Sequence, residues 1–245
     1  MPYRFDVVLS AGNDFIYNPD VGRFTRAKNF HEQRADFLLK RYKAWILDFD
    51  GTLTRQTPVR IFMALWLVGY YLIHPKRFNE IFVLRDWRTL RENLFAVEEK
   101  NYRERQLAEL SRRYDMPKSS VEKILHTWMI ERPLKILRFC VRKNLLVAAK
   151  NYQRLGVKMI VYSDNPVKEK LRAINFFPDE SFSSDDEQIR CMKPDSRGLK
   201  KILALNNLKP NEVLYIGDRD DRDGICARRA GVEYLDVNDF EKVTL

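Results

Sequence analysis

Residues 45–54 read WILDFDGTLT, and this stretch decides the fold class that we expect for the chain. An apolar run ends abruptly at two acidic residues, Asp48 and Asp50, which a single residue separates. Residues two apart in an extended chain point to the same side, so the two carboxylates repel each other. Mg²⁺ binds one or two carboxylates together with waters and phosphate oxygens. The stretch therefore predicts one half of a magnesium site at the end of a strand.

Two later segments have the same pattern. VKMIVYSD, residues 157–164, ends at Ser163 and Asp164, and EVLYIGD, residues 212–218, ends at Asp218. Such runs are typical of buried parallel strands, and segments with helical periodicity separate them. Alternating strands and helices predict a doubly wound α/β fold, a parallel sheet with helices on both faces. Ligands bind beyond the carboxyl ends of such strands, so we expect the polar endings to meet at one edge.

The region between the first two strands has a different character. VEKILHTWM and LKILRFCVRKNLLVAAKNYQRL carry apolar residues at three- and four-residue spacing, which predicts helices. We therefore expect an all-helical cap domain at residues 56–155, inserted into a Rossmann-like core made of residues 44–55 and 156–245. Residues 1–43 form an extension in which YRFDVVLS, DFIY and the turn-like NPDVG suggest a hairpin. AKNFHEQRADFLLKRY, residues 27–42, then suggests an amphipathic helix.

Composition bounds the class of protein. The chain has 245 residues and three cysteines without CxxC spacing, so neither a disulfide framework nor a zinc site is indicated. No run reaches the roughly 18 apolar residues of a membrane span, and the first residues lack the pattern of a signal peptide. We expect a reduced, cytoplasmic protein.

The net charge of +10 is concentrated in the predicted cap. Residues 55–158 hold 22 Lys and Arg against 10 Asp and Glu, which gives +12, and the remainder is 22 − 24 = −2. A solvated helical face explains this block most simply. Attraction to an anionic substrate, a membrane surface or nucleic acid is the sharper alternative, although no nucleic-acid-binding module is recognisable.

The apolar segment IFMALWLVGYYLI, residues 61–73, lies at the start of this basic block. It is too short to span a membrane, and it lacks the polar face of a helix that lies on a membrane surface. The sequence favours cap core or a cap–cap dimer contact, with peripheral membrane contact as the weaker alternative. Monomer and homodimer both stay open.

The second half of the predicted site comes from the other strand ends. YIGDRDDRDG, residues 215–224, supplies Asp218 and Asp223, and it fails as an EF-hand loop because arginines stand at the fifth and twelfth positions. Ser163 can donate to a phosphoryl oxygen, and Lys193 can neutralise phosphate charge. Gly51 lets the backbone turn sharply, so that Thr52 can offer a hydroxyl and an N–H to an anion.

Four motifs in this order resemble those of the haloacid dehalogenase-like superfamily, mainly its phosphatases with a helical cap. They are DFDGTLT at residues 48–54, Ser163 after an apolar strand, Lys193–Pro194, and GDRDDRD at residues 217–223. The resemblance spans roughly residues 44–237, and the order and spacing of all four motifs make it specific.

The resemblance implies a role for each residue. Asp48 would attack phosphorus and form an aspartyl-phosphate, and Asp50 would act as acid and then as base. Thr52, Ser163 and Lys193 would bind the phosphoryl group. Mg²⁺ would be held by the Asp48 carboxylate, the Asp50 main-chain carbonyl and Asp218, with Asp223 as a ligand or support.

The family comparison also shows departures and leaves alternatives. Dehalogenase members lack an Asp at the position of Asp50, so its presence favours phosphate chemistry. Arg55 stands where many small-molecule phosphatases carry Asp, and Asp164 replaces a more usual Asn.

We expect a phosphatase for a small phosphorylated molecule of undetermined identity. A sugar-phosphate mutase or other phosphotransferase is the alternative enzyme, and a non-catalytic binding protein is the alternative outside enzymes.

Overall fold

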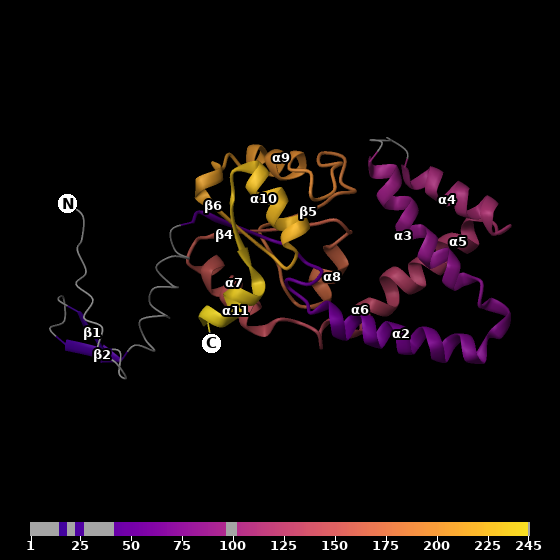
Figure 1. The fold of residues 1–245 in the computed structure, drawn as a ribbon, viewed down its shortest axis with the longest axis horizontal. Helices are drawn as coiled ribbons and strands as arrows, with labels where there is room; N and C mark the ends of the chain where they lie inside the picture. The colour runs from indigo at the N-terminus through magenta and orange to yellow at the C-terminus, as the bar shows by residue number, and fades with distance from the viewer. Residues whose placement is uncertain (1–14, 19–22, 27–41, 97–101, 245) are drawn as a thin grey trace.

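The computed structural model describes residues 15–18, 23–26, 42–96 and 102–244. Its centre is a five-stranded parallel sheet with the order β5–β4–β3–β6–β7 (Figure 1). The strands are β3 (Ala44–Leu47), β4 (Lys158–Ser163), β5 (Glu180–Ser183), β6 (Val213–Gly217) and β7 (Glu233–Asp236). Helices cover both faces of this sheet, so the predicted doubly wound α/β fold is confirmed.

Strand β3 is the central strand, and its register decides where the polar strand ends meet. Leu47 pairs with Val161 of β4 on one side and with Ile216 of β6 on the other. The main-chain N–H of Asp48 continues the ladder by donating to the Ile216 carbonyl at 3.0 Å. The chain order reverses at β3, which is the point where open α/β sheets bind ligands.

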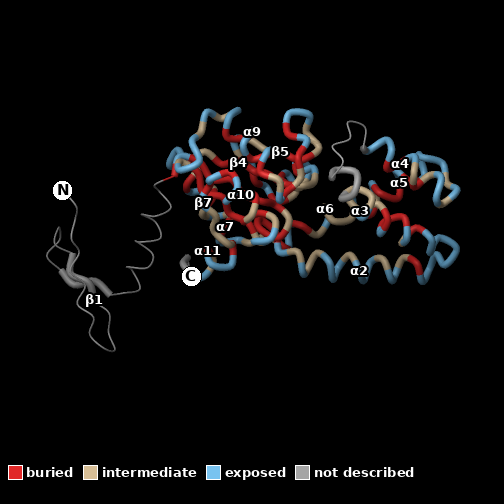
Figure 2. The backbone as a smooth tube through the Cα atoms, turned by 45° about the horizontal axis from the view of Figure 1, so that its top comes forward, coloured by how far each residue is buried: buried red, intermediate tan, exposed pale blue. Residues whose placement is uncertain are grey.

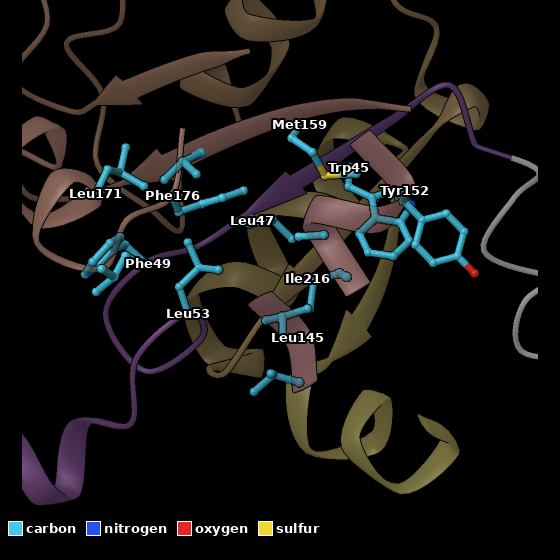
Figure 3. Close-up of a cluster of buried hydrophobic side chains, with 14 of the residues drawn as sticks. Trp45, Leu47, Phe49, Leu53, Leu145, Tyr152, Met159, Leu171, Phe176 and Ile216 are labelled. Carbon is cyan, nitrogen blue, oxygen red and sulfur yellow. The ribbon is translucent and has the colours of Figure 1, made fainter. Parts of the chain in front are cut away.

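Alternate residues of each strand point to opposite faces of the sheet, and each face has its own core. On one face Trp45 and Leu47 pack with α7 (Lys143–Arg154), α8 (Lys168–Ala173) and α11 (Val237–Thr244), as Figure 3 shows in part. On the other face Ala44 and Ile46 pack with α9 (Arg197–Leu205) and α10 (Ile225–Ala230). The short helices η3 (Pro210–Glu212) and η4 (Asp220–Gly224) flank β6.

A helical cap follows β3 and stands to one side of the sheet (Figure 1). Its elements are α2 (Gln56–Ile73), η1 (Pro75–Arg77), α3 (Glu80–Ala96), α4 (Tyr102–Arg113), α5 (Lys118–Leu125), η2 (His126–Glu131) and α6 (Arg132–Leu137). It has a separate hydrophobic cluster built around Leu110, Val121 and Trp128. Because this core is independent of the sheet, the cap is a distinct packing unit.

Helix α7 differs from the sequence expectation, which assigned it to the cap through residue 155. Leu145 and Ala149 are fully buried in the cluster under the sheet, and the ring of Tyr152 lies 4.6 Å from that of Trp45 (Figure 3). The helical repeat that marks α7 as amphipathic does not say which core receives its apolar face. That face packs on the sheet, so the cap's packing unit ends before α7.

The N-terminal extension is described only in part. Strands β1 (Phe15–Asn18) and β2 (Arg23–Arg26) pair antiparallel around NPDVG, so a hairpin does form there. The predicted helix at residues 27–42 and the segment YRFDVVLS lie outside the described residues, apart from Tyr42 at the helix's predicted end. Tyr42 joins the buried core under the sheet.

The cysteines agree with the expectation of a chain without a disulfide framework. Cys140, Cys191 and Cys226 are buried free thiols. Within the described ranges, no helix combines the length and the hydropathy that crossing a membrane requires.

Leu145→Ala tests the placement of α7. Removing a fully buried leucine from the sheet's core should lower the free energy of unfolding by about 2–5 kcal/mol. Val147→Ala on the same helix is the matched control, because Val147 is 57% exposed and a surface change of this kind costs less than about 0.5 kcal/mol. Urea denaturation measures both, and equal small effects would contradict the burial of α7 against the sheet.

Candidate active site

The centre of the site is the ammonium group of Lys193, which lies between two buried carboxylates. Its Nζ is 2.6 Å from Asp48 Oδ1 and 2.6 Å from Asp223 Oδ1, and it donates to the Tyr215 hydroxyl at 3.2 Å. All three charged side chains are at least nine-tenths buried. Removing one partner of a buried ion pair is strongly destabilising, because it leaves an uncompensated charge in the interior.

Asp218 adds a third carboxylate to this group. One carboxylate oxygen from each of Asp48, Asp218 and Asp223 lies within 4.8 Å of the others. When all three carboxylates are ionised, one lysine leaves an excess of two negative charges in a largely buried place. Burial, opposed by Lys193 and reinforced by Asp223, raises the pKa of Asp48 to about 8. Burial and Asp223 also raise the pKa of Asp218 to about 6.

This donor set fits a divalent cation. Oxygen ligands from two or three carboxylates suit Mg²⁺, and a charge of +2 equals the excess negative charge. A second observation points the same way: Thr52 is fully buried, and its hydroxyl has no hydrogen-bond partner among the described residues. An unpaired buried hydroxyl is costly, so a ligand oxygen is a natural partner for it.

Gly51 makes the close approach of these segments possible. Its φ is +111°, and a Cβ built on it would lie 1.9 Å from Asp218 Oδ2. Any side chain would therefore collide with the carboxylate, in addition to straining the backbone. Arg142 Nε donates to the Gly51 carbonyl at 3.1 Å, which holds the turn in place.

Asp50 has different partners from Asp48. Its Oδ2 accepts from Lys170 Nζ at 2.6 Å and from Asn165 Nδ2 at 3.2 Å. Burial alone would raise the pKa of Asp50, but its contacts with Lys170 and Asn165 lower that pKa below its ordinary value. Its main-chain carbonyl, which the resemblance assigns to the metal, accepts from Gln56 Nε2 at 3.0 Å. A carbonyl has a second lone pair, so this hydrogen bond leaves room for a metal.

Ser163 ends β4, the strand beside β3, and is buried. Its hydroxyl accepts from the Asn165 N–H at 3.2 Å. Asn165 in turn donates to Asp50, so the loop after β4 contacts the loop after β3. Among the predicted residues, the structure thus clusters Asp48, Lys193, Asp218 and Asp223, while Ser163 and Asp50 meet through Asn165.

Asp164, a departure from the family pattern, has a structural role. Its Oδ1 accepts from the Lys193 N–H at 3.0 Å, and its Oδ2 pairs with Arg222 at 3.0 Å. Arg222 also donates to the Lys193 carbonyl at 2.7 Å. Asp164 and Arg222 together therefore hold the backbone on both sides of Lys193.

Arg91 brings the cap into contact with the site. It comes from α3 and donates to the Asn165 side chain, to the Asp164 carbonyl at 2.5 Å and to Asp185 Oδ1 at 2.7 Å. Since Asn165 donates to Asp50, the chain Arg91–Asn165–Asp50 links the cap to a predicted catalytic residue. Arg91 is only 13% exposed.

Sequence reasoning missed Arg91, Asn165, Lys170 and Arg222. Asn165 and Lys170 follow Ser163 closely, so a search of the segment after that motif could have found them. Arg222 interrupts the acidic run GDRDDRD, where an arginine among aspartates suggests an internal pair. Arg91 gave no signal, because it is one of many cationic residues in the cap.

Comparison with known proteins agrees with this geometry. The family model of haloacid dehalogenase-like hydrolases matches residues 42–231, and the chain belongs to this family. No functionally curated protein matches the sequence.

Solved structures of low identity share the fold. The chain is similar to a 2-haloacid dehalogenase from Pseudomonas syringae (12% identity, TM-score 0.55, covering 79% of this chain and 85% of the other). It is also similar to the L-2-haloacid dehalogenase from Xanthobacter autotrophicus (14% identity, TM-score 0.52, covering 79% of this chain and 76% of the other). A proposed phosphoglycolate phosphatase from Lactobacillus delbrueckii is also similar (17% identity, TM-score 0.45, covering 80% of this chain and 86% of the other).

The raised pKa values predict how the metal-free protein responds to pH. Asp48 and Asp218 titrate at about 8 and about 6 in the folded chain, against 3.8 as the ordinary value. Between about pH 4 and pH 8 the folded state therefore holds more protons than the unfolded chain, so stability falls as pH rises. Because protons compete with a cation, Mg²⁺ should raise Tm more at about pH 8 than at about pH 5.

Thermal denaturation with EDTA and with Mg²⁺ at the two pH values measures both effects. Asp48→Asn should remove most of the pH slope of the metal-free protein, since Asn does not titrate. Equal Mg²⁺ shifts at both pH values, together with a flat metal-free profile, would contradict the assignment.

Proposed function

We propose that this protein is a divalent-metal-dependent phosphatase, with Mg²⁺ as the ion, that hydrolyses a small phosphomonoester through an aspartyl-phosphate on Asp48. The observation that carries the proposal is the arrangement of Asp48 against Lys193, with Asp50 two residues further on. Membership of a hydrolase family supports hydrolysis in general. The choice of phosphate over halide rests on the residues of this chain.

Asp50 favours phosphate chemistry. Cleavage of a phosphate ester needs a proton for the leaving oxygen and then a base for water, whereas a halide leaves without a proton. Asp50 is two residues from the proposed nucleophile, and its charge is near enough to contribute to the raised pKa of Asp48. The dehalogenases among the structural neighbours share 12–14% identity with this chain, which speaks for fold and not for substrate.

In the first step, Asp48 attacks phosphorus and the ester P–O bond breaks. Lys193 contacts Oδ1 of Asp48, which leaves Oδ2 as the attacking atom. Lys193, Ser163 and Thr52 would bind the phosphoryl oxygens, and Asp50 would give a proton to the leaving alkoxide. A bound divalent cation, held by Asp48, Asp218, Asp223 and the Asp50 carbonyl, would keep Asp48 ionised and offset the phosphate charge.

In the second step, water attacks the aspartyl-phosphate and releases phosphate. Asp50, held ionised by Lys170 and Asn165, is suited to take the proton from that water. The same contacts oppose the earlier acid role, because a carboxylate paired with lysine holds no proton. We infer that an anionic substrate draws Lys170 away and so lets Asp50 take up a proton before the first step.

Two other functions use the same fold. A sugar-phosphate mutase would pass the phosphoryl group to a second hydroxyl and release little free phosphate. A non-catalytic binding protein would keep its biological activity after Asp48→Asn. The three buried thiols also fit a reduced compartment, and we propose a cytoplasmic location.

Asp48→Asn should abolish phosphate release from an aryl phosphate in the presence of Mg²⁺, because the amide cannot form an acyl-phosphate. We expect a loss of at least about a thousandfold, the scale seen when a nucleophile is removed. Asp221→Asn is the matched control: Asp221 is in the same acidic run, but it is exposed and paired with Arg219. Activity retained by Asp48→Asn would defeat the proposed mechanism.

Arg91→Ala should weaken catalysis through the position of the cap. Loss of its contacts to Asn165 and Asp185 removes one of the links between the cap and the core, so we expect kcat/KM to fall about 10–100-fold while folding is preserved. Arg88→Ala on the same helix is exposed and serves as the control. Steady-state kinetics measure kcat/KM of each variant for an aryl phosphate and for a phosphorylated metabolite. Equal kcat/KM values for Arg91→Ala and Arg88→Ala would show that Arg91 has no part in the reaction.

A further inference from the structure

Helix α2 presents an apolar face to solvent. It runs along one edge of the cap, as Figures 1 and 2 show, and between residues 61 and 73 it has no charged side chain. Leu65 is 65% exposed, and Leu72 and Ile73 are each 77% exposed. Other apolar residues of the helix are also exposed, namely Ile61, Phe62, Trp66 and Val68. An apolar surface of this extent on one helix indicates a binding face.

The opposite face of α2 packs into the cap. Tyr71 is buried in the cap's cluster, and Met63, Leu67 and Tyr70 pack against it. The helix is therefore apolar all round, which is typical of an element covered on every side. A helix that lies on a membrane normally needs a polar face because its other side meets water. Here the cap core occupies that side, so the lack of a polar face is no objection.

Cations stand at both ends of the exposed face. Arg60 precedes it and is exposed, and Lys76 and Arg77 follow it in the exposed turn η1, where Arg77 also pairs with Glu80 at 2.6 Å. Arg132 lies alongside, with its guanidinium 5.4 Å from the ring of Trp66. The cap that contains α2, residues 55–141, holds 17 Lys and Arg against 10 Asp and Glu, which gives a net charge of +7. The occupant of the face is therefore both apolar at its centre and anionic at its rim.

We propose that α2 is a docking face for an anionic phospholipid surface. Acyl chains would meet the apolar residues from Ile61 to Ile73, and acidic headgroups would meet the flanking arginines and lysine. A second copy of this chain fits less well, because antiparallel pairing of α2 with itself would bring Arg60 of one copy near Lys76 of the other. Lipid is the partner that supplies apolar contact and negative charge in one layer.

The position of α2 relates this face to the catalytic edge. The helix begins at Gln56, whose amide donates to the Asp50 carbonyl. Eighteen residues of α-helix extend about 27 Å. Docking of α2 would hold the strand ends within that distance of the headgroups. The docking face does not depend on the proposed reaction, and binding can be measured without turnover.

Co-sedimentation of the full chain with two kinds of vesicle tests the proposal. One kind is pure phosphatidylcholine, and the other contains roughly 30% phosphatidylglycerol. We expect binding to the anionic vesicles, at least about tenfold weaker binding to the neutral ones, and release when NaCl rises from about 0.1 to about 0.5 M.

Substitutions then locate the binding face. Leu65→Gln with Leu72→Gln should weaken binding to anionic vesicles by at least about tenfold, because two exposed apolar side chains are lost from the contact. Lys76→Gln should weaken it by about fivefold. The matched control is Phe177→Gln with Leu205→Gln. These two apolar side chains lie on the surface of the α/β domain, outside the cap, and are 65% and 55% exposed. Circular dichroism and the melting temperature of each variant confirm that it is folded.

Four results would overturn the proposal. The first is no sedimentation with either vesicle. The second is binding to anionic vesicles that the Leu65 and Leu72 variant leaves unchanged, which would mean non-specific attraction by the basic cap. The third is a dimer in light scattering that the same variant dissociates, without any vesicle binding, which would make a second copy the occupant. If the control variant and the α2 variant lose binding equally, the α2 face is also excluded.

Discussion

The contact of Lys193 with Asp48 and Asp223 is the interaction on which the site depends. Each distance is 2.6 Å, and all three charges are buried, so removing any one leaves the others uncompensated. The three residues come from the ends of distant segments, and only the parallel sheet brings them together. Asp164 and Arg222 hold the backbone around Lys193, while Gly51 lets Asp218 approach. The fold therefore concentrates negative charge at a place where oxygen ligands suit a divalent cation.

The cap is tied to this centre at two places. Gln56, the first residue of α2, contacts Asp50 directly, and Arg91 of α3 reaches Asp50 through Asn165. A change in the cap's position would therefore alter the hydrogen bonding of the residue that we propose as acid and base. If α2 docks on lipid, the same helix joins the membrane surface to the catalytic edge. Substrate selection and localisation would then both depend on the cap, while the chemistry stays with the strand ends.

Much of the core could be predicted, because its signals are local. An apolar run followed by Asp48 or Asp218 can be recognised in a stretch of about ten residues, and parallel strands have their carboxyl ends at one edge of the sheet. The contacts of Lys170 and Arg91 could not be predicted, because they join residues that are 120 and 74 positions from their partners. The packing of α7 on the sheet could not be predicted for a related reason: the sequence of an amphipathic helix shows that one face is buried, but not which core receives that face.

The sequence by itself determined three strands that end in polar residues, their alternation with helices, the presence of a helical insertion and a set of candidate site residues. Hydrophobic periodicity and short motifs contain that information because they depend on neighbours along the chain. Only the tertiary structure decided which carboxylates share a lysine, that Asp50 is paired with Lys170, and that the outer side of α2 stays exposed. Those facts depend on distances between remote segments and on burial, which arise when the whole chain packs.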